Sequence, residues 1–270
     1  MTASWNTRYT SLIYCISVAL FFLPVLYFAD DVELIPESPS IPDRIPETIP
    51  NFADILDVEL KKQTFFNFIE PLVDDINADI QKQRQGVFAI RNKVSRNEEP
   101  TNNELNFLSS LAEIYEMQAD EYGNLAFLNS LLRRVDEIPA SLALAQAANE
   151  SAWGTSRFAQ NGYNFFGQWC YTNGCGIVPM RRLEGASHEV RRFESVRDSV
   201  EAYIHNLNTF PSYQMLRRIR QQLRQQNRPV DGISLADGLE SYSARGLDYV
   251  DELQRMIYSN NLTERDNPTL

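Results

Sequence analysis

The sequence predicts a mainly α-helical protein that carries one small β-hairpin. Apolar residues recur at steps of three, four or seven over several long stretches, which is the pattern of helices with one buried face. A capping box, Thr101-x-x-Glu104, precedes one of these stretches. Hydrophobic residues make up 43% and charged residues 23% of the 270 positions, so the chain can bury a sizeable core as one large domain or two small ones.

Residues 11–29 form an uncharged apolar run between Arg8 and the pair Asp30 and Asp31. A membrane-spanning helix needs roughly 20 apolar residues, whereas the apolar core of a signal peptide has about 7 to 15. The length and the flanks of the run favour a signal anchor that consists of residues 1–29. Such an anchor would hold the body of the chain on the periplasmic side of the inner membrane. A cleaved signal peptide, which would release the body into the periplasm, and a buried soluble helix are the alternatives.

Residues 30–50 are predicted to be a proline-rich linker. The segment IPESPSIPDRIPETIP, residues 35–50, contains five prolines and has no sustained apolar periodicity. Proline has no backbone N–H for a helix or a strand ladder, so the segment favours an extended, semi-rigid conformation. It would act as a spacer after an anchor, or it would be a disordered leader left by processing.

Residues 51–134 are predicted to form a helical extension. Its first apolar stripe starts after Leu60, and Pro71 is expected to kink that helix near its start. A second stretch follows the capping box, and a third runs from Leu125 to Val135. We expect the stripes to be core or helix-packing surfaces. The first stripe contains Phe65, Ile69, Leu72, Ile76, Ile80, Val87, Ile90 and Val94.

The segment PASLALAQAANESAWG, residues 139–154, predicts a helix that begins after a proline and ends at Gly154. Glu150 points away from the small, apolar face of this helix, and Gln146 lies one turn before it. A carboxyl group in the last turn lies near the negative end of the helix dipole, which should raise its pKa. A raised pKa suits a general acid, although a helical Glu is more commonly a solvated surface residue.

The next segment, residues 156–176, places aromatic side chains among side-chain amides and glycines. Aromatic rings stack on sugar faces, and amides bind hydroxyl and acetamido groups, so the pattern is typical of carbohydrate recognition. A loop held together by its own aromatic residues is the alternative. The predicted substrate-binding residues are Gln146, Asn164, Phe166, Gln168 and Trp169.

Cys170 and Cys175 are predicted to form a disulfide. An exported body would sit in an oxidising compartment, where two thiols so close together are expected to oxidise. A reduced pair is the alternative. A zinc site made by these cysteines with His188 and His205 is disfavoured, because the spacing fits no zinc-finger pattern.

Residues 178–193, VPMRRLEGASHEVRRF, predict the β-hairpin, with Glu184 and Gly185 at or near its turn. Helical spacing resumes at Val196 and continues in further segments as far as Ile257.

The chain is acidic, with a formal net charge of -11, which argues against a protein that grips nucleic-acid phosphates. A basic zone on the hairpin and on a following helix stands out against this charge. A solvated face is the preferred interpretation, and contact with the carboxylates of peptide stems is the alternative. The zone contains Arg181, Arg182, Arg191, Arg192, Arg217, Arg218, Arg220 and Arg224.

The segment LALAQAANESAWGTSRFAQNGYNFFGQWC resembles the catalytic region of the bacterial glucosaminidase family, glycoside hydrolase family seventy-three, which includes the flagellar peptidoglycan-hydrolysing protein. The stretches GQWCYTNGCGIVP, GASHEVRRF and YSARGLDYVDEL resemble the Bax-like branch of that family. N-E-S-x-W-G, followed by S-R-F-A and N-x-F-G, is a demanding combination. The expected catalytic domain therefore covers residues 135–262, with a short tail over 263–270.

The resemblance implies a lysozyme-like helical lobe with a small β-hairpin lobe across the cleft. It also implies cleavage of peptidoglycan glycan strands on the reducing side of N-acetylglucosamine, with Glu150 as the general acid. No metal or other cofactor is expected. Tyr249 matches a tyrosine that the family commonly keeps near the cleft. Glu184 and Glu189 are both candidates for a second carboxylate, so retaining, inverting and substrate-assisted mechanisms stay open.

Two rival functions share these features. A lytic transglycosylase would use the same lobe and a single Glu, but it would release an anhydro-sugar instead of a free reducing end. A non-catalytic cell-wall-binding protein could keep the aromatic cleft without turnover, and the presence of Glu150 counts against it.

Overall fold

The computed structural model describes residues 48–118, 122–180, 182 and 185–266. They belong to one compact unit with limits at Ile35 and Leu270. The signal anchor expected at 1–29 and nearly all of the expected linker lie outside the described residues. Within the described ranges, no helix combines the length and the apolar character that a membrane crossing requires.

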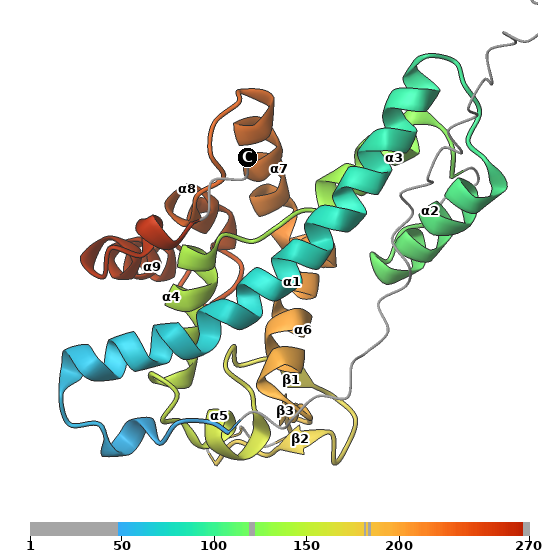
Figure 1. Cartoon of the computed structure of the whole chain (residues 1–270). Helices are drawn as coiled ribbons and strands as arrows, with labels where there is room; N and C mark the ends of the chain where they lie inside the picture. Colours follow the sequence, from blue (N-terminus) through green and yellow to red (C-terminus); the bar gives the residue numbers. More distant parts are fainter. Residues whose placement is uncertain (1–47, 119–121, 181, 183–184, 267–270) are drawn as a thin grey trace, which may run out of the picture. The chain divides into compact units, whose positions relative to one another are not determined.

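The prediction of a mainly helical fold with a small antiparallel sheet is confirmed (Figure 1). The N-terminal helical elements are η1 (Phe52–Asp54), α1 (Val58–Ser95), α2 (Asn102–Ile114) and α3 (Leu125–Arg134). The following ones are α4 (Ala140–Ser151), α5 (Arg157–Gly162), α6 (Val196–Thr209), η2 (Pro211–Tyr213), α7 (Gln214–Gln225), α8 (Gly232–Ala236), η3 (Asp237–Leu239), α9 (Leu247–Ser259) and η4 (Leu262–Arg265).

Helix α1 is 38 residues long, and it packs against α3, α4 and α6. Asp57 caps its N-terminus by accepting a hydrogen bond from the backbone N–H of Leu60. The helix continues through Pro71, and its axis turns in its N-terminal part (Figure 1). The capping box predicted at the start of α2 is formed, since the side chains of Thr101 and Glu104 each accept a hydrogen bond from the other's backbone N–H.

Helix α4 lies at the centre of the core. Its residues from Ala140 to Ala148 are all buried, and the helix packs against α1, α8, α9 and η4. Because a single core cluster extends from Phe52 to Leu262, the expected extension over 51–134 and the expected catalytic domain share one hydrophobic core. The expected boundary at residue 135 is therefore not a boundary between compact units.

The sheet differs from the predicted hairpin. Its strands are β1 (Trp169–Cys170), β2 (Gly176–Ile177) and β3 (Glu189–Arg191), in the order β1-β3-β2 with antiparallel pairing. Both partners of β3 therefore precede residue 178, within the predicted aromatic loop or directly after it. Gly176 permits the close approach of β2 and β3, because a Cβ atom there would lie 2.0 Å from the carbonyl oxygen of Val190.

The expected tail is partly structural. The Asp266 side chain accepts hydrogen bonds from the backbone N–H and the hydroxyl of Ser141, at 2.8 and 2.7 Å, and from the backbone N–H of Gly232 at 3.3 Å. These groups lie in the first turns of α4 and α8. Since Pro139, the N-cap residue of α4, offers no side-chain hydrogen bond, Asp266 supplies the missing cap from the far end of the chain.

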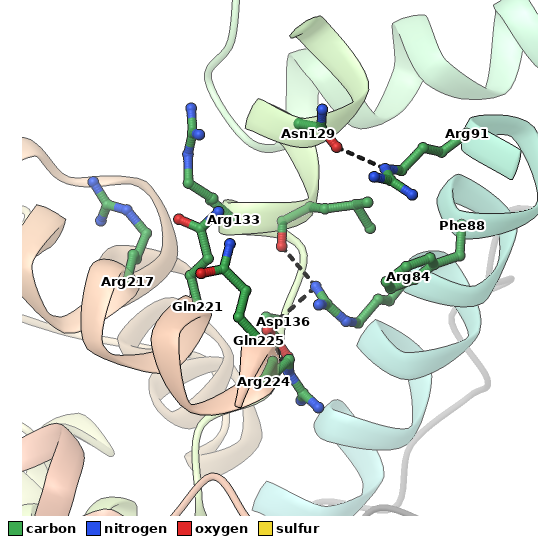
Figure 2. Close-up of a pocket in the computed structure, with 11 residues that line it drawn as sticks. Arg84, Phe88, Arg91, Asn129, Arg133, Asp136, Arg217, Gln221, Arg224 and Gln225 are labelled. Atoms are coloured by element: carbon green, nitrogen blue, oxygen red, sulfur yellow. Dashed lines mark hydrogen bonds and ion pairs between the residues drawn. The ribbon is translucent and has the colours of Figure 1, made fainter. Parts of the chain in front are cut away.

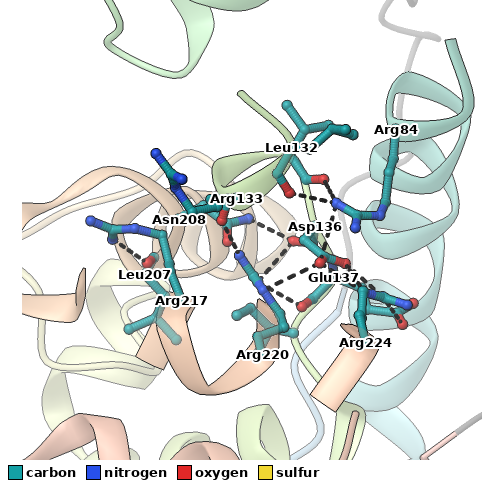
Figure 3. A network of polar contacts seen from close by, with 12 residues as sticks. Arg84, Leu132, Arg133, Asp136, Glu137, Leu207, Asn208, Arg217, Arg220 and Arg224 are labelled. Carbon is teal, nitrogen blue, oxygen red and sulfur yellow. Dashed lines mark hydrogen bonds and ion pairs between the residues drawn. The ribbon is translucent and has the colours of Figure 1, made fainter. Parts of the chain in front are cut away.

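A buried ion-pair network joins α1, α7 and the segment after α3, beside a cavity of about 210 Å³ (Figure 2). Arg84, Arg220 and Arg224 converge on Asp136, and Arg224 also pairs with Glu137 (Figure 3). The carboxyl group of Asp136 is 3% exposed, and Arg224 binds it in a bidentate manner. Arg217, Arg220 and Arg224 are therefore not part of the solvated face that the sequence suggested, whereas Arg191, Arg192 and Arg218 are exposed as expected.

Candidate active site

The end of α4 fixes the position of Glu150. Glu150 lies in the last turn of α4, as predicted, and the backbone then takes a left-handed conformation at Ala152, Trp153 and Gly154. The hydroxyl of Ser151 accepts a hydrogen bond from the backbone N–H of Gly154 at 2.7 Å. A Cβ atom at Gly154 would lie 2.4 Å from the ring of Phe52, so glycine is required where the chain leaves the helix.

A directed chain of hydrogen bonds holds the Glu150 carboxyl group. The hydroxyl of Tyr203 donates to Gln146 Oε1 at 2.6 Å, and Gln146 Nε2 donates to the hydroxyl of Tyr249 at 3.0 Å. Tyr249 in turn donates to Oε1 of Glu150 at 2.8 Å. Tyr203, Gln146 and Tyr249 are all buried, so each donor and acceptor in this chain needs the partner that it has.

Burial is the main cause of a raised pKa at Glu150. Desolvation favours the neutral acid, and the nearby charge of Glu252 acts in the same direction. The hydrogen bonds from Tyr249 and Asn149 and the charge of Arg245 lower the pKa without cancelling the effect of burial. The predicted direction is thus correct, but burial rather than the helix dipole is its main cause.

Glu150 lines a cavity of about 420 Å³. Three of the predicted substrate-binding residues line this cavity, and α6, η2 and the segment after η3 supply its other wall. The lining residues are Glu150, Phe166, Gly167, Gln168, Trp169, Asn206, Tyr213, Tyr242, Ser243 and Ala244.

The aromatic residues of the loop have different environments. Phe166 is buried and stacks on Tyr203 with ring centroids 3.9 Å apart, so it forms a fixed part of the wall. Trp169 is 56% exposed, and one face of its indole stacks on His188 at 4.1 Å. An exposed indole that is held in place in this way is a suitable platform for a sugar ring. Gln168 has a buried Oε1 atom without a partner among the described residues.

Asn164 and Gln146 do not line the cavity, so their predicted contact with substrate is corrected. The Asn164 side chain is buried, donates to the carbonyl oxygens of Gln168 and Arg191, and accepts from the N–H groups of Phe166 and Gln168. Its bonds therefore hold the loop in shape. Gln146 lies behind Tyr249, where it orients the phenol that bonds Glu150.

Glu189 is buried, and its carboxylate binds backbone groups of the sheet and of the turn beside it. Its two carboxylate oxygens accept hydrogen bonds from the backbone N–H groups of Gly174 and Gly176, at 3.0 and 2.8 Å. These bonds lower its pKa, so it stays ionised. The prediction of a catalytic carboxylate at Glu189 is not supported by this position. The other candidate, Glu184, lies outside the described residues.

Cys170 and Cys175 are joined by a disulfide whose Cα atoms lie 6.2 Å apart. Both sulfurs lie close to the carboxylate of Glu189. Since a metal would need thiolates, sulfurs that share a disulfide are not ligands, and this cluster is best described as a brace for the loop that carries Trp169.

Residues 128–262 match the glucosaminidase family, whose description is mannosyl-glycoprotein endo-β-N-acetylglucosaminidase. The chain belongs to the glucosaminidase family. It is 34% identical over 200 residues to protein Bax of Escherichia coli strain K12, and the match covers 74% of this chain and 70% of that protein. The catalytic domain of the autolysin Auto from Listeria monocytogenes is similar at 19% identity, with a TM-score of 0.43 over 79% of this chain and 92% of that domain.

As a member of this family, the glucosaminidase is a glycoside hydrolase.

The cavity wall opposite the aromatic loop was not predicted from the sequence. Tyr242 stacks on Tyr249 at 5.5 Å and donates a hydrogen bond to the carbonyl oxygen of Phe166, while Tyr213 packs against Tyr242. The resemblance of YSARGLDYVDEL to the family included Tyr242, Ser243 and Ala244, and this was the signal that could have placed them beside Glu150.

Proposed function

We propose that this glucosaminidase hydrolyses the glycan strands of peptidoglycan on the reducing side of N-acetylglucosamine, with Glu150 as the general acid. The observation that carries the proposal is the state of Glu150. Its carboxyl group lines a sugar-sized cavity, burial raises its pKa, and Tyr249 binds one of its two oxygens. A protonated, oriented carboxyl group is what departure of a sugar alkoxide requires.

The hydrogen-bond chain supports one position for the proton that would be transferred. Because Tyr249 donates to Oε1 of Glu150, that oxygen acts as an acceptor, and the transferable proton belongs on Oε2. Oε2 faces the Gly167 side of the cavity, since a Cβ atom at Gly167 would lie 3.5 Å from it. As the glycosidic bond breaks, the Oε2 proton passes to the leaving oxygen, and the phenol of Tyr249 stabilises the carboxylate that is left.

The positive charge that develops on the sugar needs a second group. Glu150 is the one carboxylate among the described residues that line the cavity. In one route the acetamido group of the substrate stabilises the cation, and the configuration at the anomeric carbon is retained. In the other route a second carboxylate such as Glu184 activates a water molecule on the opposite face of the sugar, and the configuration is inverted. The anomeric form of the first product, followed by NMR, distinguishes the two routes.

Peptidoglycan is the proposed substrate because the longer sequence stretches resemble the Bax-like branch of a peptidoglycan-hydrolysing family. The family description names an enzyme of glycoprotein glycans, and both kinds of substrate contain N-acetylglucosamine. The apolar run over residues 11–29 supports a periplasmic location of the enzyme, where it would meet peptidoglycan, with this run as a membrane anchor or an export signal.

The test is to incubate the purified protein with peptidoglycan and to identify the new chain ends by mass spectrometry after borohydride reduction. We expect reduced N-acetylglucosamine at the new ends. Anhydro-sugar ends would show a lytic transglycosylase instead. Binding to the wall material without any new ends would show a non-catalytic wall-binding protein, and either result would overturn the proposal.

A further inference from the structure

A groove between α3 and α7 is strongly basic, although the whole chain carries a net charge of -11. The groove has a volume of about 380 Å³. We call it the basic groove, and the residues that define it are Arg133, Arg134, Arg217, Arg218, Gln214 and Gln221. No carboxylate lines it among the described residues.

Among the described residues, the guanidinium groups that line the groove form no ion pair with Asp136, although Arg133 and Arg217 also line the cavity beside that carboxylate. In the described part of the chain, neither Arg133 nor Arg218 forms an ion pair, and both side chains are exposed. Figure 2 shows the side chains of Arg133 and Arg217 extending on the side away from Asp136. The positive charge of the groove is therefore not balanced by the buried carboxylate beneath it.

Arg217 gives the groove a buried cation that is held in a fixed position. It is 6% exposed, and its Nη1 atom donates to the carbonyl oxygens of Leu207 and Phe210, at 2.8 and 2.9 Å. Burial, with repulsion from Arg134 and Arg220, lowers its pKa to about 10, so the guanidinium is charged at neutral pH. An anion in the groove would relieve this repulsion, and a guanidinium held in place binds a carboxylate with little loss of side-chain entropy.

The groove and the catalytic cavity are lined by consecutive residues of the chain. Tyr213 lines the cavity, and the next residue, Gln214, lines the groove, so their Cα atoms are about 3.8 Å apart. From there Gln214, Arg217, Arg218 and Gln221 follow one face of α7 at helical spacing. The cavity and the groove therefore both adjoin the junction between η2 and α7.

The side-chain types indicate a peptide rather than a phosphate. The arginines can bind a carboxylate. The side-chain amides of Gln214 and Gln221 can both donate hydrogen bonds to peptide groups and accept hydrogen bonds from them. A phosphate offers only acceptors, so it would leave the acceptor oxygens of both glutamines unused. Peptide stems of peptidoglycan combine amide groups with free carboxylates.

We propose that the basic groove binds the carboxylate-bearing peptide stems of the glycan strand that occupies the catalytic cavity. This inference rests on the proposed function, because it takes the same polymer as the substrate. The groove would then select strands that still carry their peptides, and it would act on substrate binding rather than on bond cleavage.

The main test compares two substrates, which are glycan strands with their peptide stems and the same strands after an amidase has removed the stems. The variant is Arg133→Gln combined with Arg218→Gln, because both side chains are exposed, whereas Arg217 holds the end of α6. The matched control is Arg228→Gln combined with Arg255→Gln, which removes the same charge from exposed positions outside the groove.

For the groove variant, we expect KM on stem-bearing strands to rise about fivefold to tenfold with kcat unchanged. The same variant should match the parent on stripped strands, and the control should match it on both. An unchanged KM on stem-bearing strands would overturn the proposal, and so would an equal rise on both substrates. If the variant keeps its KM but no longer sediments with vesicles of anionic phospholipid that the parent binds, the groove is a lipid site instead.

A binding measurement makes the inference independent of turnover. A soluble stem peptide with free carboxylates is titrated by calorimetry into parent and variant, beside the same peptide with its carboxylates amidated. We expect the parent to bind the free acid more tightly than the amide, and the variant to lose that difference. If the parent cuts neither kind of strand, the proposed function fails, while this titration still decides the groove. Equal affinity of the parent for both peptides would overturn the inference.

Discussion

Tyr249 donates a 2.8 Å hydrogen bond to Oε1 of Glu150, across a sequence separation of 99 residues. This bond does two things at once. It orients the carboxyl group with Oε2 towards Gly167 in the cavity wall, and it offsets part of the rise in pKa that burial causes. The chemistry of Glu150 is therefore set from α9 as well as from its own helix.

Glu150→Gln should abolish hydrolysis while the fold is kept. The amide preserves the shape of the side chain but has no transferable proton, so we expect a loss of about 10²- to 10⁴-fold in kcat. Release of reducing ends from peptidoglycan measures the rate, and circular dichroism checks the fold. Glu113→Gln, at an exposed position on α2, is the matched control and should keep the parent rate. A Glu150→Gln enzyme close to the parent rate would rule out this residue as the acid.

Tyr249→Phe should move the alkaline limb of the pH–rate profile to higher pH. A general acid works below its pKa, so activity falls as pH rises through that pKa. The hydrogen bond from Tyr249 lowers the pKa of Glu150, and its loss raises that pKa further. We also expect kcat to fall about tenfold at the optimum, as the orientation of Oε2 is lost. Tyr258→Phe, at an exposed position on the same helix, should leave the profile unchanged.

Glu189→Gln should weaken the sheet but leave the chemistry intact. A Gln side chain has one acceptor oxygen, so it can serve only one of the N–H groups of Gly174 and Gly176. We expect KM to rise severalfold, because the loop that carries Trp169 loosens, with kcat within about twofold of the parent value. A collapse of kcat would instead make Glu189 the second carboxylate.

The same variant predicts a pH dependence of stability. Since the folded-state pKa of Glu189 is lowered, its stabilising effect is present above the unfolded-state value of about 4.3 and is lost as pH falls through the folded-state pKa. The difference in Tm between parent and Glu189→Gln should therefore be largest near pH 7 and should shrink towards pH 3. A constant difference over this range would contradict the assignment.

Asp136→Asn should be strongly destabilising. It removes the negative charge on which Arg84, Arg220 and Arg224 converge, and buried positive charges without a partner cost about 3 to 5 kcal/mol. Urea denaturation measures the change. Asp75→Asn is the contrast, since Asp75 pairs with Arg197 at a side chain that is 64% exposed, and we expect about 0 to 1 kcal/mol there. Equal effects of the two variants would show that the Asp136 network is not a main source of stability.

Cell fractionation should find the protein on the periplasmic side of the inner membrane, or in the periplasm. The apolar run over residues 11–29 is the basis of this prediction. N-terminal sequencing of the mature protein separates the two forms, because an anchored protein keeps the run and an exported one starts near Asp30. Recovery of the full-length protein in the cytosolic fraction would contradict both.

Local patterns were enough to predict the helices and the position of Glu150. The apolar stripe of α1, the capping box of α2 and the position of Glu150 in the last turn of α4 all depend on residues within a few positions of one another. The aromatic loop was also found from its composition, since Phe166, Gln168 and Trp169 line the cavity.

The roles of the polar residues could not be predicted, because they depend on partners that lie far away in the sequence. Gln146 bonds residues 57 and 103 positions away, and Asn164 bonds a carbonyl oxygen 27 positions away. Residue type shows that such a side chain will form hydrogen bonds, but it does not show with what. The sheet was mispredicted for a similar reason, because the turn signal near Gly185 suggested pairing within 178–193 while β3 pairs with β1 and β2.

The cap that Asp266 places on α4 has a consequence for the order of events during synthesis. The Ser141 groups that it binds are made 125 residues earlier, so the helix that carries Glu150 leaves the ribosome long before its N-terminus can be completed. We expect a nascent chain, or one truncated before Asp266, to hold Glu150 in a frayed helix. The first turn of the helix that carries Glu150 would thereby stay uncapped until Asp266 itself has been translated.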